Sequence, residues 1–174
     1  MNRRQFLATA ALTVTALALP TMSWATGRTR SLSFYHTHTG ESLDIAYGRP
    51  GLYDQKALEQ INSFLRDFRT GEVHPIDPKL LDILSTVREN FGGQGRIEVI
   101  SGYRSPKTNQ QLRSKSSKVA KRSLHMDGKA IDIRITGLQT RKIQQCVIGM
   151  QCGGVGLYTK SDFVHLDTGR VRFW

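Results

Sequence analysis

Several features are scarce or absent in this sequence of 174 residues, and each absence excludes a class of protein. It has only two cysteines, which excludes a disulfide-rich scaffold. It has no Gly-x-Ser-x-Gly motif to present a nucleophilic serine, and neither cysteine has a histidine near it in the sequence. The glycine-rich stretch at residues 153–156 lacks the Lys-Ser/Thr of a phosphate-binding loop, so we interpret it as a turn.

Long hydrophobic runs are also missing. The uncharged stretch at residues 6–20 follows Arg3 and Arg4 and is shorter than the ~20 residues that span a bilayer. It leads to Ser23-Trp24-Ala25, a pattern that signal peptidases cut. We therefore expect residues 1–25 to be a cleaved signal, with an N-terminal anchor helix as the alternative. The arginine pair resembles a twin-arginine signal, which implies export to the periplasm of a bacterium.

Acidic residues are few, 14 against 25 basic ones. Cleavage after Ala25 would remove two basic and no acidic residues, leaving residues 26–174 as one domain with a net charge of +9. Such a charge suits an anionic wall polymer or lipid headgroups, although a merely solvated surface is an equal alternative. Export argues against nucleic acid as a partner. No cysteine follows the cut to accept a lipid, so we expect no membrane anchor after cleavage, and we expect a monomer.

The pattern of apolar residues predicts an α+β fold with helices packed on a mainly antiparallel sheet. A β-hairpin is predicted at residues 31–36 and 42–47, followed by helices at 54–69 and 77–90. A strand at 96–101, a basic helix at 107–118 and a strand at 129–135 come next. A helix at 139–150 and a strand at 163–168 complete the prediction. Cys146 borders the apolar stripe of the 139–150 helix, so we expect a small core residue, and a disulfide with Cys152 is left open.

Strand periodicity brings two polar residues to the same kind of face. Ile131, Ile133 and Ile135 would point into the core, which leaves Asp132 on the opposite face. His165 lies on the polar face of the last strand. If these strands pair, both residues line one surface, and the glycine-containing turn at 126–128 can fold His125 back over it.

Two imidazoles and one carboxylate, with water as fourth ligand, are the ligands of a catalytic zinc site. Zinc polarises a carbonyl group and lowers the pKa of bound water to ~7. Two other histidines, His36 and His38, also have a metal-like spacing, but no third ligand is evident near them. From the residues alone, a zinc site and an ordinary polar surface both remain open.

Three motifs resemble those of a known family: Ser101-Gly-Tyr-Arg-Ser, then Ser123-x-His-x-x-Gly-x-Ala-x-Asp132, then Asp162-x-x-His165. They are similar to the zinc D-Ala-D-Ala peptidases and, more closely, to the YcbK-like murein endopeptidases. The resemblance runs from the arginine pair to Trp174. It implies one zinc ion bound by His125, Asp132 and His165, and a fold shared with hedgehog-type and lysostaphin-type domains.

The resemblance also implies roles for other residues. Asp162 matches the family's catalytic carboxylate, although Glu is commoner there, and a turn residue is the alternative. Asp167 is the alternative base, or a partner that orients a ligand histidine. Arg104 is expected to hold the oxygen that becomes negative, with a structural salt bridge as the alternative. Ser123 and Tyr103 are expected to bind substrate, or else to brace the site.

These expectations together predict an exported zinc metallopeptidase that acts on peptidoglycan stem peptides or cross-links. Whether it acts as an endopeptidase or a carboxypeptidase stays open. A non-catalytic zinc-containing domain that binds the cell wall is one alternative. A basic polymer-binding protein without metal is another.

Overall fold

The computed structural model describes residues 28–49, 51–117 and 119–174 of the chain. The predicted signal at residues 1–25 lies outside this part, so the expectation of cleavage after Ala25 stays a prediction. No helix within the described part is long and apolar enough to cross a membrane.

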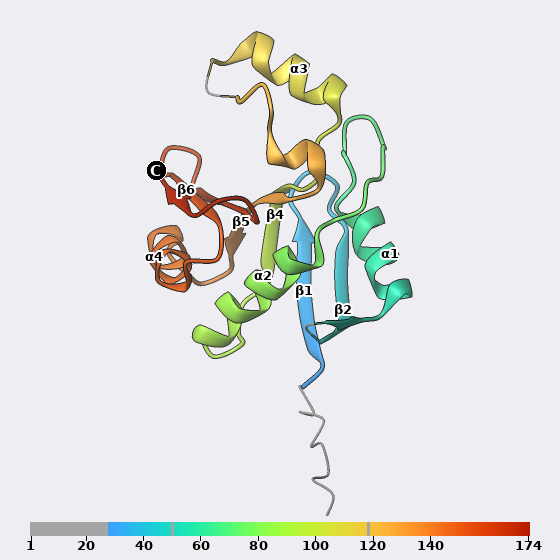
Figure 1. Cartoon of the computed structure of the whole chain (residues 1–174), viewed down its shortest axis with the longest axis vertical. Coiled ribbons are helices and arrows are strands. Elements are labelled where there is room, and N and C mark those ends of the chain that lie inside the picture. Colours follow the sequence, from blue (N-terminus) through green and yellow to red (C-terminus); the bar gives the residue numbers. More distant parts are fainter. Residues whose placement is uncertain (1–27, 50, 118) are drawn as a thin grey trace, which may run out of the picture.

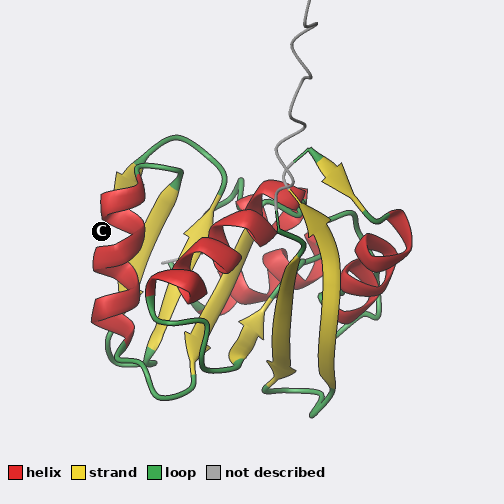
Figure 2. Ribbon diagram, turned by 90° about the horizontal axis from the view of Figure 1, so that it is seen from below, coloured by secondary structure: helices red, strands yellow, loops and turns green. Residues whose placement is uncertain are grey.

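One sheet of eight strands runs through the described residues (Figures 1 and 2). Its pairing is antiparallel except where β1 lies beside β4 and β6 beside β8. In spatial order the strands are β3 (Leu52–Tyr53), β2 (Ser42–Arg49), β1 (Arg30–His36), β4 (Ile97–Ser101), β5 (Ala130–Ile135), β7 (Phe163–Asp167), β6 (Gly154–Tyr158) and β8 (Arg172–Phe173).

Three helices pack their apolar sides against this sheet. Helix α1 (Gln55–Phe64) contacts β2, α2 (Pro78–Asn90) contacts β1, and α4 (Thr140–Met150) contacts β6 and β7. The carboxylate of Asp77 caps α2 by accepting a hydrogen bond from the Lys79 amide, with Pro78 in the first turn, as the sequence predicts. The predicted α+β class with a mainly antiparallel sheet is therefore confirmed.

The fully buried side chains form one continuous core between the helices and the sheet. Every odd-numbered isoleucine of β5 lies in it, as predicted from strand periodicity. Cys146 packs against this core, and both Cys146 and Cys152 are free thiols. The core side of the sheet is thus filled with apolar residues, which leaves polar residues for its opposite face. The largest fully buried members are Tyr47, Phe34, Leu32, Ile61, Leu65, Leu80, Leu81, Leu84, Ile97, Ile131, Ile133 and Ile135.

Three predicted elements differ from the observed ones. The helix predicted at 54–69 ends at Phe64, because a loop follows in which the Asp67 carboxylate accepts backbone hydrogen bonds from Arg69 and Ser105. The helix predicted at 107–118 is α3 (Pro106–Lys115), which begins one residue earlier and ends sooner. The turn predicted at 153–156 is wrong, because β6 begins at Gly154.

Candidate metal centre

Asp132 and His165 lie directly opposite each other on the paired strands β5 and β7. This register confirms the expectation that the two strands pair and present both residues on one face. His125 comes from a 3-10 helix, η1 (Leu124–Asp127), which precedes β5. The helix ends at Gly128, whose φ of 65° is left-handed and whose missing side chain leaves room for the Pro75 carbonyl oxygen. The tight turn at Gly128 thereby brings His125 over the strand.

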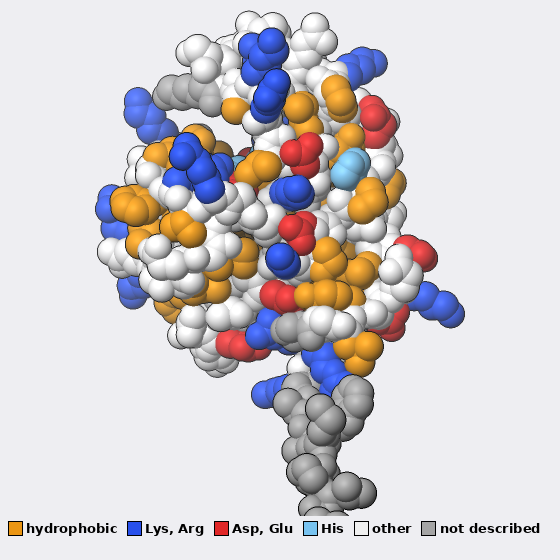
Figure 3. All heavy atoms as spheres, viewed as in Figure 1, with side chains coloured by type: hydrophobic (Ala, Val, Ile, Leu, Met, Phe, Trp, Pro, Cys, Tyr) orange, Lys and Arg blue, Asp and Glu red, His pale blue; other side chains and the backbone are white. Residues whose placement is uncertain are grey.

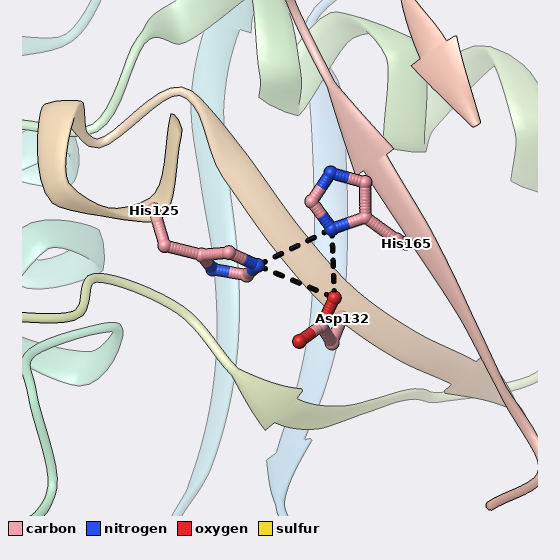
Figure 4. A group of neighbouring side chains, drawn as sticks. All are labelled: His125, Asp132 and His165. Atoms are coloured by element: carbon pink, nitrogen blue, oxygen red, sulfur yellow. Dashed lines mark hydrogen bonds and ion pairs between the residues drawn. The ribbon is translucent and has the colours of Figure 1, made fainter. Parts of the chain in front are cut away.

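The three side chains converge on one point (Figure 4). His165 Nδ1 lies 2.9 Å from Asp132 Oδ1 and 3.2 Å from His125 Nε2. His125 Nε2 lies 3.3 Å from the same carboxylate oxygen. Ligand atoms around a tetrahedral zinc ion, at bond lengths of about 2.0–2.2 Å, are separated by about 3.3 Å. The spacing of the three atoms therefore fits a single small cation.

The far nitrogen of each imidazole has a hydrogen-bond acceptor beside it. His125 Nδ1 lies 2.8 Å from the Gly102 carbonyl oxygen, and His165 Nε2 lies 3.0 Å from Asp167 Oδ2. Each of these nitrogens must carry a proton to donate, so in the neutral imidazoles the near nitrogens carry lone pairs. Two nitrogen lone pairs and a carboxylate oxygen then face one another. That arrangement is unfavourable unless a positive charge lies between them.

The pKa values of Asp132 and His165 indicate surroundings that favour positive charge, whereas that of His125 is governed by burial. Burial acts to raise the pKa of Asp132, but His125 and His165 outweigh it and hold this pKa below its usual range. Burial acts to lower the pKa of His165, but hydrogen bonds to Asp132 and Asp167 raise it to about 8. For His125, complete burial dominates and lowers the pKa despite the nearby Asp132. Asp132 is thus kept ionised and His125 neutral, the forms that bind a metal, whereas His165 has to give up a proton when a metal binds.

Asp167 is a buried carboxylate that supports His165. Besides His165 Nε2, it contacts Arg172 NH2 at 2.7 Å and accepts hydrogen bonds from the Gly154 and Gly169 amides. Burial acts to raise its pKa, but the hydrogen bonds from His165 and Arg172 lower it to about 2. Its oxygens are occupied by these donors and do not reach the converging ligand atoms. These contacts are those expected of a residue that orients His165.

A cleft of about 520 Å³ opens over the three ligands. Arg104 and Ser123 line it, as the sequence predicts for residues that contact substrate. The Arg104 guanidinium lies 3.4 Å from Asp132 Oδ2 and 3.3 Å from Ser101 Oγ. Burial lowers the Arg104 pKa, partly offset by the negative charge of Asp132. This side chain is thus a largely buried cation beside His125, Asp132 and His165.

Two predicted site residues lie elsewhere. Asp162 is in the turn before β7 with a φ of 48°, and its exposed carboxylate accepts a hydrogen bond from the Thr140 hydroxyl at 3.0 Å. It does not line the cleft, and this placement matches its alternative role as a turn residue. Tyr103 is buried in the core and stacks on His74 with ring centroids 4.8 Å apart. Tyr103 therefore packs beneath the site and does not line the cleft.

Sequence reasoning missed an aromatic wall on the other side of the cleft, formed by Tyr158, Phe163 and Trp174. The Trp174 ring lies 5.4 Å from the His165 ring and occupies the space where a side chain at Gly156 would be. A glycine inside a strand often marks such a close approach. The three glycines at residues 153–156, two of them inside β6, could therefore have indicated this wall, but not which ring fills the space.

A His-Asp-His cluster with the imidazoles oriented through their far nitrogens, on one face of an α+β sheet, is typical of the metal site of a hydrolase. Comparison with known proteins specifies it further. The model of the family described as peptidoglycan L,D-endopeptidase MepK matches residues 24–174. The chain belongs to this family.

Individual relatives agree along nearly the whole chain. It is 40% identical over 176 residues to the peptidoglycan L,D-endopeptidase MepK of Escherichia coli strain K12, covering 99% of this chain and 97% of that protein. It is 37% identical over 177 residues to the probable peptidoglycan L,D-endopeptidase MepK of Haemophilus influenzae, covering 99% and 95%. These matches confirm the resemblance to murein endopeptidases on which the sequence motifs were interpreted.

Proposed function

We propose that this chain is a zinc-dependent endopeptidase that hydrolyses L,D peptide bonds in peptidoglycan, with His125, Asp132 and His165 as its zinc ligands. The observation that carries the proposal is the convergence of two imidazole nitrogens and one carboxylate oxygen within a substrate-sized cleft. The relatives' names supply the bond type. Zinc would supply a Lewis acid for the peptide carbonyl and a water of lowered pKa.

The residues around the proposed zinc ligands would orient these ligands, stabilise negative charge on the substrate and bind the peptide. The Gly102 carbonyl and Asp167 keep the two imidazoles in the orientation and protonation state that a metal needs. The Arg104 guanidinium, a planar donor that stays charged, would hold the substrate oxygen that gains negative charge. Ser123, in the cleft wall next to His125, would bind the peptide backbone.

The basic character of the surface near the cleft suits this substrate. Figure 3 shows lysine and arginine side chains over α3 and beside the hollow between α3 and the C-terminal strands. Stem peptides of peptidoglycan carry free carboxylates, which a positive rim attracts. Export through a twin-arginine signal, with cleavage after Ala25, would bring the protein to this substrate in the periplasm. Sequencing of the native N-terminus should read Thr26, and a protein that starts at Met1 would contradict this.

Digestion of purified murein tests the activity directly. The protein with one zinc ion per chain should release products cut at an L,D bond, identified by mass spectrometry, and chelation should stop the release. A carboxypeptidase would instead release only terminal residues. A zinc-loaded protein that binds murein without cutting it would favour the alternative of a non-catalytic wall-binding domain.

A further inference from the structure

We propose that Tyr158 is a second hydrogen-bond donor for the substrate oxygen that gains negative charge, acting with Arg104, and that Trp174 orients its hydroxyl. The inference rests on the proposed function, since it adds a catalytic residue to that reaction. It starts from the aromatic wall of the cleft, which no sequence motif assigns.

The position of Tyr158 follows from strand register. In β6, Gly156 pairs with His165 and Tyr158 pairs with Phe163. Side chains alternate along a strand, so Gly156 and Tyr158 point to the same face as His165. The Tyr158 ring stacks on Phe163, with centroids 4.5 Å apart and an interplanar angle of 14°. This stacking fixes the ring in the wall of the cleft that Arg104 also lines.

The indole of Trp174 determines the direction of the Tyr158 proton. Trp174 Nε1 lies 3.2 Å from the Tyr158 hydroxyl oxygen. An indole nitrogen can only donate, so the phenol oxygen accepts this bond and keeps its own proton for another acceptor. Among the described residues, no acceptor lies within hydrogen-bond distance of that proton. Because Tyr158 lines the cleft, its hydroxyl can turn this proton toward a substrate bound there.

Trp174 is itself held in place. Its ring fills the space above Gly156, and its backbone pairs with Val155 and Leu157 of β6. The Arg172 guanidinium carbon lies 5.1 Å above the ring. The donor that orients Tyr158 is therefore fixed by the sheet, which is what a preorganised hydrogen bond to a developing charge requires.

The chemistry needs no proton transfer from Tyr158. As water adds to the carbonyl carbon, the C=O electron pair moves to the oxygen, and the phenol O–H stabilises the charge through a hydrogen bond. When the C–N bond breaks, the C=O bond re-forms and the leaving amine takes up the proton that the attacking water released. The phenol keeps its own proton and accepts the hydrogen bond from Trp174 throughout.

Replacement of Tyr158 by phenylalanine tests the proposal, because the ring and its stacking on Phe163 remain and only the hydroxyl is lost. With a muropeptide cross-link as substrate, kcat should fall by about 10²–10³, as for loss of one such donor, while KM and zinc content stay unchanged. Tyr35→Phe is the matched control and should keep the full rate. Tyr35 is partly exposed on β1, which β4, β5 and β7 separate from β6 in the sheet.

A second measurement does not depend on turnover. A phosphinate analogue of the cross-link carries a tetrahedral anion, so its affinity, measured by calorimetry, should fall in Tyr158→Phe by at least tenfold. The affinity of an uncleaved peptide should not change. An unchanged kcat, an unchanged phosphinate affinity, or a rise in KM alone would each overturn the proposal. Failure of the wild-type, zinc-loaded protein to cut murein would instead count against the proposed function.

The role of Trp174 is tested by coupling. Trp174→Phe keeps a ring above Gly156 but removes the Nε1 donor, so kcat should fall less than in Tyr158→Phe, by about three- to tenfold. The double variant should be no slower than Tyr158→Phe alone, since the indole acts through the hydroxyl. Losses that multiply would show that Trp174 acts independently, and would overturn its part of the proposal.

Discussion

Two pairs of histidines lie at this sheet, each with one member on a strand, His165 on β7 and His36 on β1. The two pairs differ in whether their ring nitrogens face hydrogen-bond acceptors or donors. In the pair His125 and His165, the far nitrogens face acceptors, so the near nitrogens present lone pairs. In the pair His36 and His38, the backbone amide of His38 donates to His36 Nδ1 at 3.2 Å, which occupies that lone pair. The other nitrogen of His36, Nε2, is buried without a hydrogen-bond partner in the described part of the chain.

The surroundings differ in the same way. His165 is flanked by the carboxylates of Asp132 and Asp167, whereas the rings of Phe64 and Phe68 pack against His36 at 6.0 and 5.5 Å. His38 stacks on Phe68 with centroids 4.2 Å apart. The spacing of histidines in a sequence therefore does not define a metal site. What defines it is whether the far nitrogen meets an acceptor and a carboxylate completes the set.

The largest expected effect separates the two pairs. His165→Ala removes a proposed ligand and should abolish stoichiometric zinc, and turnover with it. The two ligands that remain would bind zinc too weakly to keep one ion per chain at the protein concentrations used. His38→Ala, the matched control in the other pair, should keep one zinc per chain. Metal analysis after dialysis decides between them. Full zinc in His165→Ala together with loss in His38→Ala would move the site to the other end of the sheet.

An intermediate effect is expected from the carboxylate that orients His165. Asp167→Asn should weaken zinc binding by about 10–100-fold, since the far nitrogen of His165 loses its charged acceptor. A competition titration with a chelator measures this loss. Asp162→Asn, a matched change at an exposed turn, should leave zinc affinity unchanged and turnover within about twofold. A loss of about 10²–10⁴ in turnover with zinc retained would instead restore Asp162 as the general base.

The smallest effect concerns His36, which packs against phenylalanine rings, and it appears only when the pH is lowered. Burial lowers the pKa of His36 to about 4, with a further contribution from His38. Because an unfolded histidine titrates near ~6.5, the unfolded state binds more protons between these values, so the free energy of unfolding falls as pH drops through that window. The loss attributable to His36 amounts to at most about 3 kcal/mol at ~1.4 kcal/mol per pKa unit.

Denaturant titrations of the wild type and of His36→Leu isolate the contribution of His36 to the free energy of unfolding. Other groups titrate equally in both proteins. Between pH 6.5 and 4 the unfolding free energy of the wild type should therefore fall more steeply than that of the variant, and above pH 7 the two should change in parallel. Parallel curves across the whole range would show that His36 takes up a proton in the folded state as readily as in the unfolded state.

Much of the metal centre could be predicted from strand periodicity and motif resemblance. The alternation along residues 131–135 placed Asp132 on the polar face, and the observed register sets it opposite His165. Asp167 shares the His165 face for the same reason. Periodicity is local, so it could be applied without knowledge of the rest of the fold.

What could not be predicted depends on contacts between distant residues. The glycines at 153–156 form a strand because their missing side chains make room for Asp167, Arg172 and Trp174, which come from elsewhere in the fold. Asp162 has the spacing of a catalytic carboxylate, but its left-handed backbone turns it toward Thr140 on α4. No local pattern distinguishes these outcomes, because each depends on where another segment packs.

The position of Trp174 also has a consequence for spectroscopy. It is the only tryptophan between residues 26 and 174, because the other one, Trp24, lies in the predicted signal. Its ring lies 5.4 Å from a proposed metal ligand and shares the cleft wall with Tyr158. The tryptophan fluorescence of a chain cut after Ala25 would therefore report from one place, the cleft itself. Metal uptake and substrate entry can be followed by emission, without a label and at concentrations too low for calorimetry.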